Sequence, residues 1–204
     1  MKLPDFIDEL IPLPGCFLVF DDDDKSEAED EEEKVFLDSS KDPEKAEAVL
    51  GVFRMSKSNS ISLLQEATVL NENGFYPRAA ALAIMSYEEL GKSQIAADYY
   101  TKLIPESIYK AAFRKHEKTA YTSRHRAIGN HEKVKHGFYI NKSIARELET
   151  MRQRALYVDE NNNPSESFSK DDAELIISKV AEHQRAIEHA EQLNCRIGSK
   201  ALFK

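Results

Sequence analysis

The chain has 204 residues, of which 41% are hydrophobic and 31% are charged, and its formal net charge is −8. This composition is typical of a soluble globular protein, and no apolar run approaches the roughly 20 residues that cross a bilayer, so we expect no membrane partner. Two cysteines without a CxxC motif, Cys16 and Cys195, argue against a zinc site and for a reducing compartment, so we predict a cytoplasmic location.

The charge is distributed unevenly along the chain. Residues 21–33 hold ten acids and one lysine, a charge of −9, which leaves about +1 for all other residues. Residues 110–155 hold twelve Lys or Arg against four acids, together with four histidines. We expect the acidic segment to be disordered because like charges repel. It serves either as a mimic of phosphate charge that occupies a basic surface or as a solubilising linker.

The first 40 residues are predicted to be an arm, and 41–204 a helical domain. Residues 1–20 are apolar with three prolines and form either a short strand or a packed arm. A first helix is expected to begin at Pro43 with Asp42 as its cap. We predict a polar break at SKSNS, 56–60, and a second helix over Ser60–Asn73. The first helix is expected to run through Ala46, Val49 and Leu50, and the expected inward residues of the second are Ile61, Leu64, Ala67 and Leu70.

A central helix is predicted over about 77–102. Gly74 ends the preceding helix because glycine tolerates the left-handed conformation, and Pro77 suits a first turn. Pro105 stops the central helix. Its apolar residues recur at helical spacing and predict a buried stripe. The stripe contains Ala80, Ile84, Tyr87, Gly91 and Ile95.

Three more helices are expected over about 106–127, 141–156 and 170–195. Gly129 and Asn130 end the first of them, and DENNNPSES at 159–167 is typical of a loop. Strand-like alternation is absent after residue 40. The sequence therefore predicts an all-α fold, an antiparallel helical bundle. The expected inward residues are Ile108, Ala112 and Phe113, then Leu175, Ile176, Val180 and Ile187.

Charged residues stand beside the stripe of the central helix. At about 100° per residue, Glu88 lies about 40° from Ile84, and Glu89 lies farther round. Lys92 is one turn beyond Glu88 and is expected to pair with it. The simple interpretation is a solvated ion pair. A glycine inside a helix costs roughly 1 kcal/mol relative to alanine, so Gly91 next to a half-buried carboxylate favours a close helix approach or a site.

Three segments resemble a known family. GFYPRAAALAIMSYEELGKSQI after Leu70, FRKHEK at 113–118, and RALYVD at 154–159 followed by Pro164 are similar to the AbiV-type abortive-infection proteins of the HEPN superfamily. The resemblance spans about residues 60–195. It implies a small all-helical domain, a homodimer, and phage defence through RNA cleavage.

The same resemblance implies an R-x4–6-H motif. Arg126 and His131 fit with four intervening residues, and Arg124 and His131 fit with six. The segment FRKHEK instead nominates His116, so the choice of histidine stays open. A polar residue on the preceding helix often supports such a site, and Glu88 or Glu89 is the candidate. The alternative for 124–131 is a solvated basic turn.

An arginine and a histidine in this motif need neither a metal nor a cofactor to act on RNA. A histidine near neutrality takes the 2′-OH proton, and arginine binds the scissile phosphate, so RNA is cut to a 2′,3′-cyclic phosphate. His131 and His136 are one residue too far apart for a helical metal pair. Further RNA contacts are expected from basic residues and from stacking tyrosines, which are otherwise core residues. The basic residues are Lys92, Arg114, Lys118, Lys133 and Lys135, and the tyrosines Tyr99, Tyr100, Tyr109, Tyr121 and Tyr139.

Two other functions fit the sequence. One is a non-catalytic helical module that binds or senses a phage or host protein, such as an activator or antitoxin. The other is an RNA-binding protein without cleavage. Metal-independent cleavage that is lost on changing one histidine separates the enzyme from both.

Overall fold

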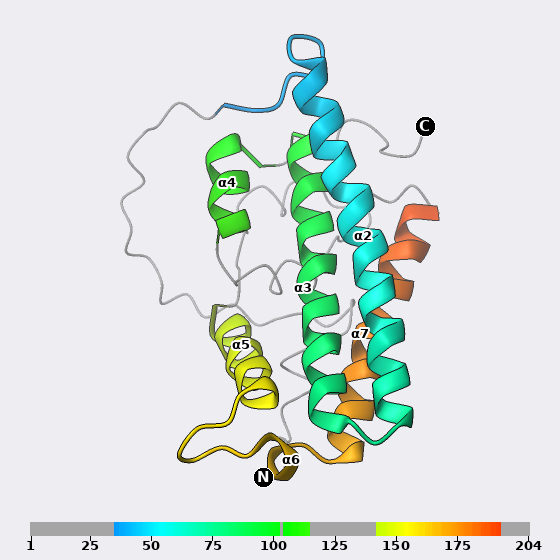
Figure 1. The fold of residues 1–204 in the computed structure, drawn as a ribbon. Helices are drawn as coiled ribbons and strands as arrows, with labels where there is room; N and C mark the ends of the chain where they lie inside the picture. Colours follow the sequence, from blue (N-terminus) through cyan, green and yellow to red (C-terminus); the bar gives the residue numbers. More distant parts are fainter. Residues whose placement is uncertain (1–34, 103, 115–141, 193–204) are drawn as a thin grey trace.

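The computed structural model describes residues 35–102, 104–114 and 142–192 (Figure 1). All regular elements in these ranges are helices, apart from an isolated bridge between Asp159 and Asn162. This confirms the all-α prediction. The helices are α2 (Pro43–Glu72), α3 (Tyr76–Tyr100), α4 (Glu106–Arg114), α5 (Lys142–Leu156), α6 (Pro164–Ser167) and α7 (Lys170–Gln192).

Helices α2 and α3 form the centre of the bundle and run in opposite directions (Figure 1). The turn between them needs glycine, because Gly74 has a φ of 81°. Helix α7 packs against both, while α4 and α5 lie on the other side of α3. The predicted cap is confirmed, since the Asp42 carboxylate accepts a hydrogen bond from the Lys45 N–H at 3.0 Å.

The core has two apolar clusters, both built on α3. The predicted stripe of the central helix is confirmed, because all five of its residues are buried. One cluster joins α3 to α5 and α7, where the Tyr87 ring meets the fully buried His183 edge-on at 5.1 Å. The other cluster joins the opposite end of α3 to α2 and includes Phe53 and Tyr99. Apolar residues on both sides of α3 explain why most of its residues are buried.

The predicted break at 56–60 is wrong, because α2 runs through it without interruption. The Ser60 hydroxyl donates to the Ser86 carbonyl at 2.8 Å, and the Ser86 hydroxyl donates to the Ser60 carbonyl at 2.7 Å. The Gln184 amide from α7 donates to the Ser60 hydroxyl at 2.9 Å. Small polar residues in the serine run thus become a buried contact between three helices. Ile61, expected inside, is 42% exposed.

The remaining helices follow the prediction where the structure describes them. Helix α5 and the start of α7 match, while α6 is a single turn inside the expected loop. The predicted inward residues Ile176 and Val180 are fully buried. Residues 1–34 of the predicted N-terminal arm, with the acidic segment, lie outside the described residues, as do the end of the helix over 106–127 and Cys195.

Candidate functional site

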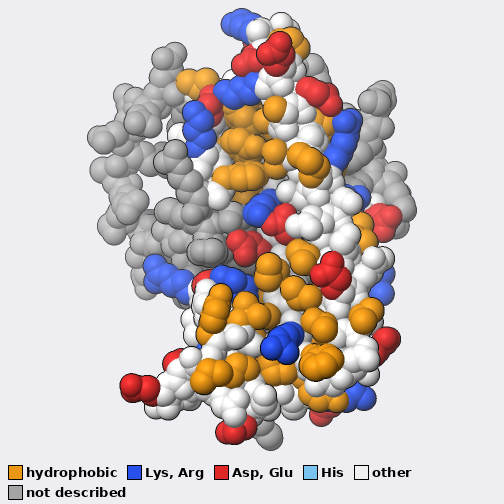
Figure 2. All heavy atoms as spheres, viewed as in Figure 1, with side chains coloured by type: hydrophobic (Ala, Val, Ile, Leu, Met, Phe, Trp, Pro, Cys, Tyr) orange, Lys and Arg blue, Asp and Glu red, His pale blue; other side chains and the backbone are white. Residues whose placement is uncertain are grey.

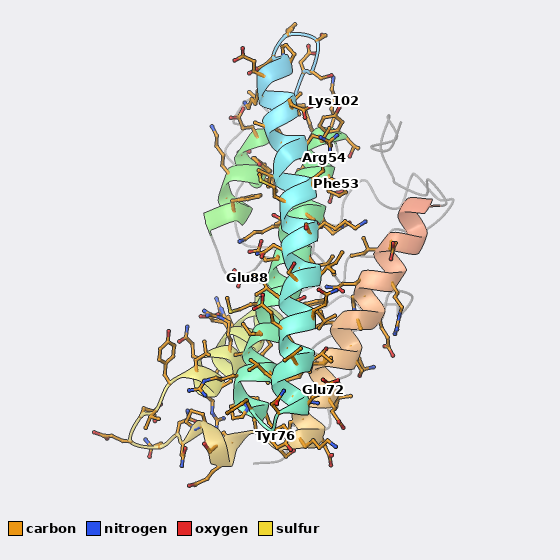
Figure 3. The ribbon with its side chains drawn as sticks, turned by 45° about the vertical axis from the view of Figure 1, so that its right-hand side comes forward. Phe53, Arg54, Glu72, Tyr76, Glu88 and Lys102 are labelled. Carbon is orange, nitrogen blue, oxygen red and sulfur yellow. The ribbon has the colours of Figure 1, made fainter. Side chains whose placement is uncertain are left out.

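Three charged residues lie midway along α3. Figure 3 shows Glu88 on the side of α3 where α4 and α5 lie. The Lys92 ammonium donates to the Glu89 carboxylate, and both side chains are mostly buried. The predicted pairing of Lys92 with Glu88 is therefore wrong. On the helical wheel Glu88 stands closer to the buried stripe than Glu89 does, so it faces the neighbouring helix instead.

Helix α5 brings an arginine to the same region. The Arg152 guanidinium donates from Nε to Glu149 Oε2 at 2.8 Å and from Nη2 to Glu149 Oε1 at 2.7 Å. The Gln153 amide also donates to Glu149, at 2.7 Å. The Arg152 side chain is 14% exposed, so this fork holds a largely desolvated cation in one orientation.

The charges on the two helices act on one another. The pKa of Arg152 is raised, first by its hydrogen bonds to Glu149 and further by the negative charges of Glu149 and Glu88. The charge of Glu88 on α3 therefore acts on Arg152 across the contact between α3 and α5. We refer to Glu88, Glu89, Lys92, Glu149 and Arg152 as the α3–α5 cluster.

The α3–α5 cluster unites two segments that are far apart in the sequence. The EELGK segment supplies Glu88, and the turn of α5 just before RALYVD supplies Arg152. Glu149 and Arg152 were not among the predicted site residues. A signal for Arg152 exists, because it lies about 40° from the buried Leu148, as Glu88 does from Ile84. Helical spacing alone does not say that the edge of α3 with Glu88 faces the edge of α5 with Arg152.

Most of the predicted site residues lie outside the described residues. The only one besides the α3 residues that falls in a described helix is Arg114, the last residue of α4, whose side chain is not described. Helix α4, described up to Arg114, and α5, described from Lys142, lie on the same side of α3 (Figure 1), the side on which Figure 3 shows Glu88. The chain therefore leaves and re-enters the described structure on this side. Outside are His116, Lys118, Arg124, Arg126, His131, Lys133 and Lys135.

The α3–α5 cluster offers acid–base and phosphate-binding groups. Two of the five N–H donors of Arg152 bond Glu149, and within the described residues no hydrogen bond occupies the other three. The cluster contains three carboxylates and two cations. Across the described ranges, no group of three or more His, Cys, Asp or Glu is arranged to hold a metal ion.

A second charged cluster joins α2 to α4. The Glu106 carboxylate accepts from Lys45 at 2.8 Å and from Lys110 at 2.6 Å. These bonds, first that from Lys110, lower the pKa of Glu106 to about 2. The Lys45 ammonium lies 5.9 Å from the centre of the Tyr99 ring, which stacks on Tyr109 at 4.5 Å. We refer to Lys45, Glu106 and Lys110 as the α2–α4 cluster.

The tyrosines of this region belong to the core. Tyr99 is fully buried, and Tyr100 and Tyr109 are partly buried against the same apolar cluster. Stacking of RNA bases on Tyr99 is therefore excluded, and the core interpretation is confirmed for it. Tyr121 and Tyr139 lie outside the described residues.

The comparisons with known proteins agree with this fold. A protein-family model described as AbiV, of the HEPN type, matches residues 48–185. The match covers more than half of the chain and includes all of α3 and α5. No curated protein matches the chain, and no solved structure does. None of the helices in the described ranges has both the length and the apolar character needed to cross a membrane.

Proposed function

Since the chain belongs to the AbiV family of HEPN proteins, of the abortive-infection type, we propose that it is a metal-independent RNA endonuclease. It acts in phage defence by cutting RNA through attack of the 2′-hydroxyl on the adjacent phosphate. DNA lacks this nucleophile and is not cut. The active form is a homodimer in which the two R–H motifs share one cleft.

The observation that carries this proposal is the α3–α5 cluster. Arg152 is a desolvated guanidinium in a fixed orientation, and three of its N–H donors are not bonded by any described residue, which suits a phosphate whose charge grows in the transition state. The Glu88 carboxylate nearby suits the role of orienting a histidine and holding its tautomer. His116 or His131 supplies the acid–base group, and the basic residues around them bind the RNA backbone.

The first experiment incubates the purified chain with mixed tRNA and mRNA in EDTA and reads the product ends. We expect 2′,3′-cyclic phosphate ends, lost in only one of His116→Ala and His131→Ala. Glu88→Gln should reduce the rate at least tenfold because the histidine loses its orienting partner. Glu72→Gln, at the exposed end of α2 (Figure 3), is the matched control and should cleave normally. If no RNA is cut under these conditions, the enzyme proposal fails.

A second candidate is a non-catalytic interaction module, and the composition of the cluster favours it. The α3–α5 cluster contains three carboxylates and two cations, so its local charge is negative, which opposes RNA. In that case the histidine variants change neither RNA cleavage nor protection against phage, while a phage or host protein binds the bundle. Cleavage lost in a single histidine variant would exclude this candidate.

A further inference from the structure

The strongest feature outside the α3–α5 cluster is the loop that follows α5. Leu156, Tyr157 and Val158 are three consecutive large hydrophobic residues, and they are 37%, 61% and 77% exposed. Figure 1 shows this loop projecting away from the bundle between α5 and α6. The exposed hydrophobic residues of α2, in contrast, are isolated along the helix; they are Met55, Ile61 and Val69.

The loop is held in place by hydrogen bonds. The Asn162 side chain is nearly buried, and its amide donates to the Arg154 carbonyl at 2.8 Å and to the Tyr157 carbonyl at 2.7 Å. Its amide oxygen accepts from the Ser167 hydroxyl at 2.7 Å. The Asp159 N–H donates to the Asn162 carbonyl at 3.1 Å. These bonds end α5 and fix the backbone that carries Tyr157 and Val158.

A fixed loop with apolar side chains in water is suited to binding. The exposed apolar area of these side chains stays in water in this fold, and burying it on a partner is favourable. A preformed loop also loses little conformational entropy on binding, so more of the contact energy appears as affinity. The loop therefore has the properties of a preorganised docking surface.

The charge of the loop selects the class of partner. Residues 155–169 contain Asp159, Glu160 and Glu166 and no Lys or Arg, which gives −3. Figure 2 shows acidic side chains at the lower left edge of the molecule, over this loop. Like charge disfavours RNA and anionic membranes. A protein surface with an apolar pocket and basic residues around it is complementary in both respects.

We propose that the loop over 156–160 is the docking surface for a partner protein that has an apolar pocket surrounded by lysine and arginine. Tyr157 and Val158 enter the pocket, and Asp159 and Glu160 meet its basic edge. This goes beyond RNA cleavage and does not rest on it, because no residue of the loop belongs to the proposed catalytic set. An aromatic residue in a pocket is a frequent source of binding energy in protein interfaces.

The test replaces Tyr157 in the full chain with the photo-crosslinker p-benzoylphenylalanine, in cells with and without phage. The same replacement at Met55, which is 66% exposed, is the control. We expect a specific protein adduct from position 157 only, with the crosslink on a peptide that contains apolar and basic residues. Adducts only to RNA, only to a second copy of the chain, or equally from position 55 would overturn the proposal.

The captured protein is then purified and titrated against the full chain. The double variant Tyr157→Ser, Val158→Ser should weaken binding at least tenfold. The double variant Asp159→Lys, Glu160→Lys should also weaken binding, and by a larger factor at low salt than at high salt. Met55→Ser with Val69→Ser should leave the affinity unchanged. An affinity that does not respond to the changes at 159 and 160, or that falls equally with the control pair, would refute the proposed surface.

Discussion

The α2–α4 cluster and the α3–α5 cluster contain similar ion pairs but connect the bundle differently. In the α2–α4 cluster, Glu106 bonds Lys45 from another helix and Lys110 from its own helix. In the α3–α5 cluster, Lys92 bonds Glu89 within α3, and Arg152 bonds Glu149 within α5. The first cluster therefore links two helices by a direct bond, whereas the second orients charges within each helix.

This difference separates a structural role from a functional one. A bond from α2 to α4 adds to the stability of the fold, because unfolding breaks it. A pair three residues apart on one helix adds only tenths of a kcal/mol, yet it fixes the direction of a side chain. Desolvated charges held in a fixed orientation suit the recognition of a charged substrate.

The largest effect is expected from Arg152→Gln. Cleavage of RNA should fall about 100-fold, because a phosphate-binding donor is lost in a water-poor site. The free energy of unfolding should change by less than about 1 kcal/mol, since the lost pair is within one helix. Single-turnover cleavage and urea unfolding of the same preparation measure both. Arg54→Gln, which removes an exposed pair to Glu47 at 3.2 Å, is the matched control and should change neither.

The reverse result is expected from Glu106→Gln in the α2–α4 cluster. It removes two charge-assisted hydrogen bonds and should lower the free energy of unfolding by about 1–2 kcal/mol. The cleavage rate at 25 °C should stay within twofold of that of the unaltered chain. Thermal melts and cleavage assays check this, and a loss of cleavage larger than that of Arg152→Gln would reverse the roles assigned to the clusters.

The pH dependence of stability should also come from the α2–α4 cluster. The pKa of Glu106 is about 2 in the folded chain and is 4.5 ordinarily, so its contribution is complete above about pH 4.5. It is lost as the pH falls from 4.5 toward 2, because the unfolded chain then binds the proton more readily. Urea unfolding should show that the free energy of unfolding changes less with pH across this range in Glu106→Gln than in the unaltered chain. Identical pH profiles for Glu106→Gln and the unaltered chain would refute the assignment of this pH dependence to Glu106.

The smallest effect is expected from Lys92→Met. Stability should fall by less than about 0.5 kcal/mol, because the pair with Glu89 is within α3. If Lys92 contacts an RNA phosphate, the slope of log affinity against log salt should decrease by about one. Fluorescence titrations at several salt concentrations measure this slope. Lys57→Met on α2 provides a comparison, and an equal change there would show a general charge effect.

The sequence predicted the fold better than it predicted the site. Helical spacing identified the buried stripe of α3 because a helix fixes which residues share one face. The break at 56–60 was wrong because a serine run is polar locally, while the partners of Ser60 are Ser86 and Gln184 on other helices. The serine preference for turns was overridden by hydrogen bonds that form only in the assembled bundle.

The candidate site shows the same limit. The position of Glu88 beside the stripe followed from counting residues, but the choice of Glu89 as the partner of Lys92 did not. Arg152 was missed because its importance depends on Glu88, 64 positions earlier in the chain. A helical wheel places each residue on its own helix and carries no information about which edges of two helices meet.

The sequence by itself determined most of the helices, the cap at Asp42, the left-handed turn at Gly74 and membership of the AbiV family, because these depend on local spacing and residue type. Only the tertiary structure decided that α3 and α5 bring Glu88 and Arg152 together, and that Asn162 holds Tyr157 and Val158 in solvent. The physical reason is distance in the chain. Contacts between distant segments depend on how whole faces pack, and no single segment contains that information.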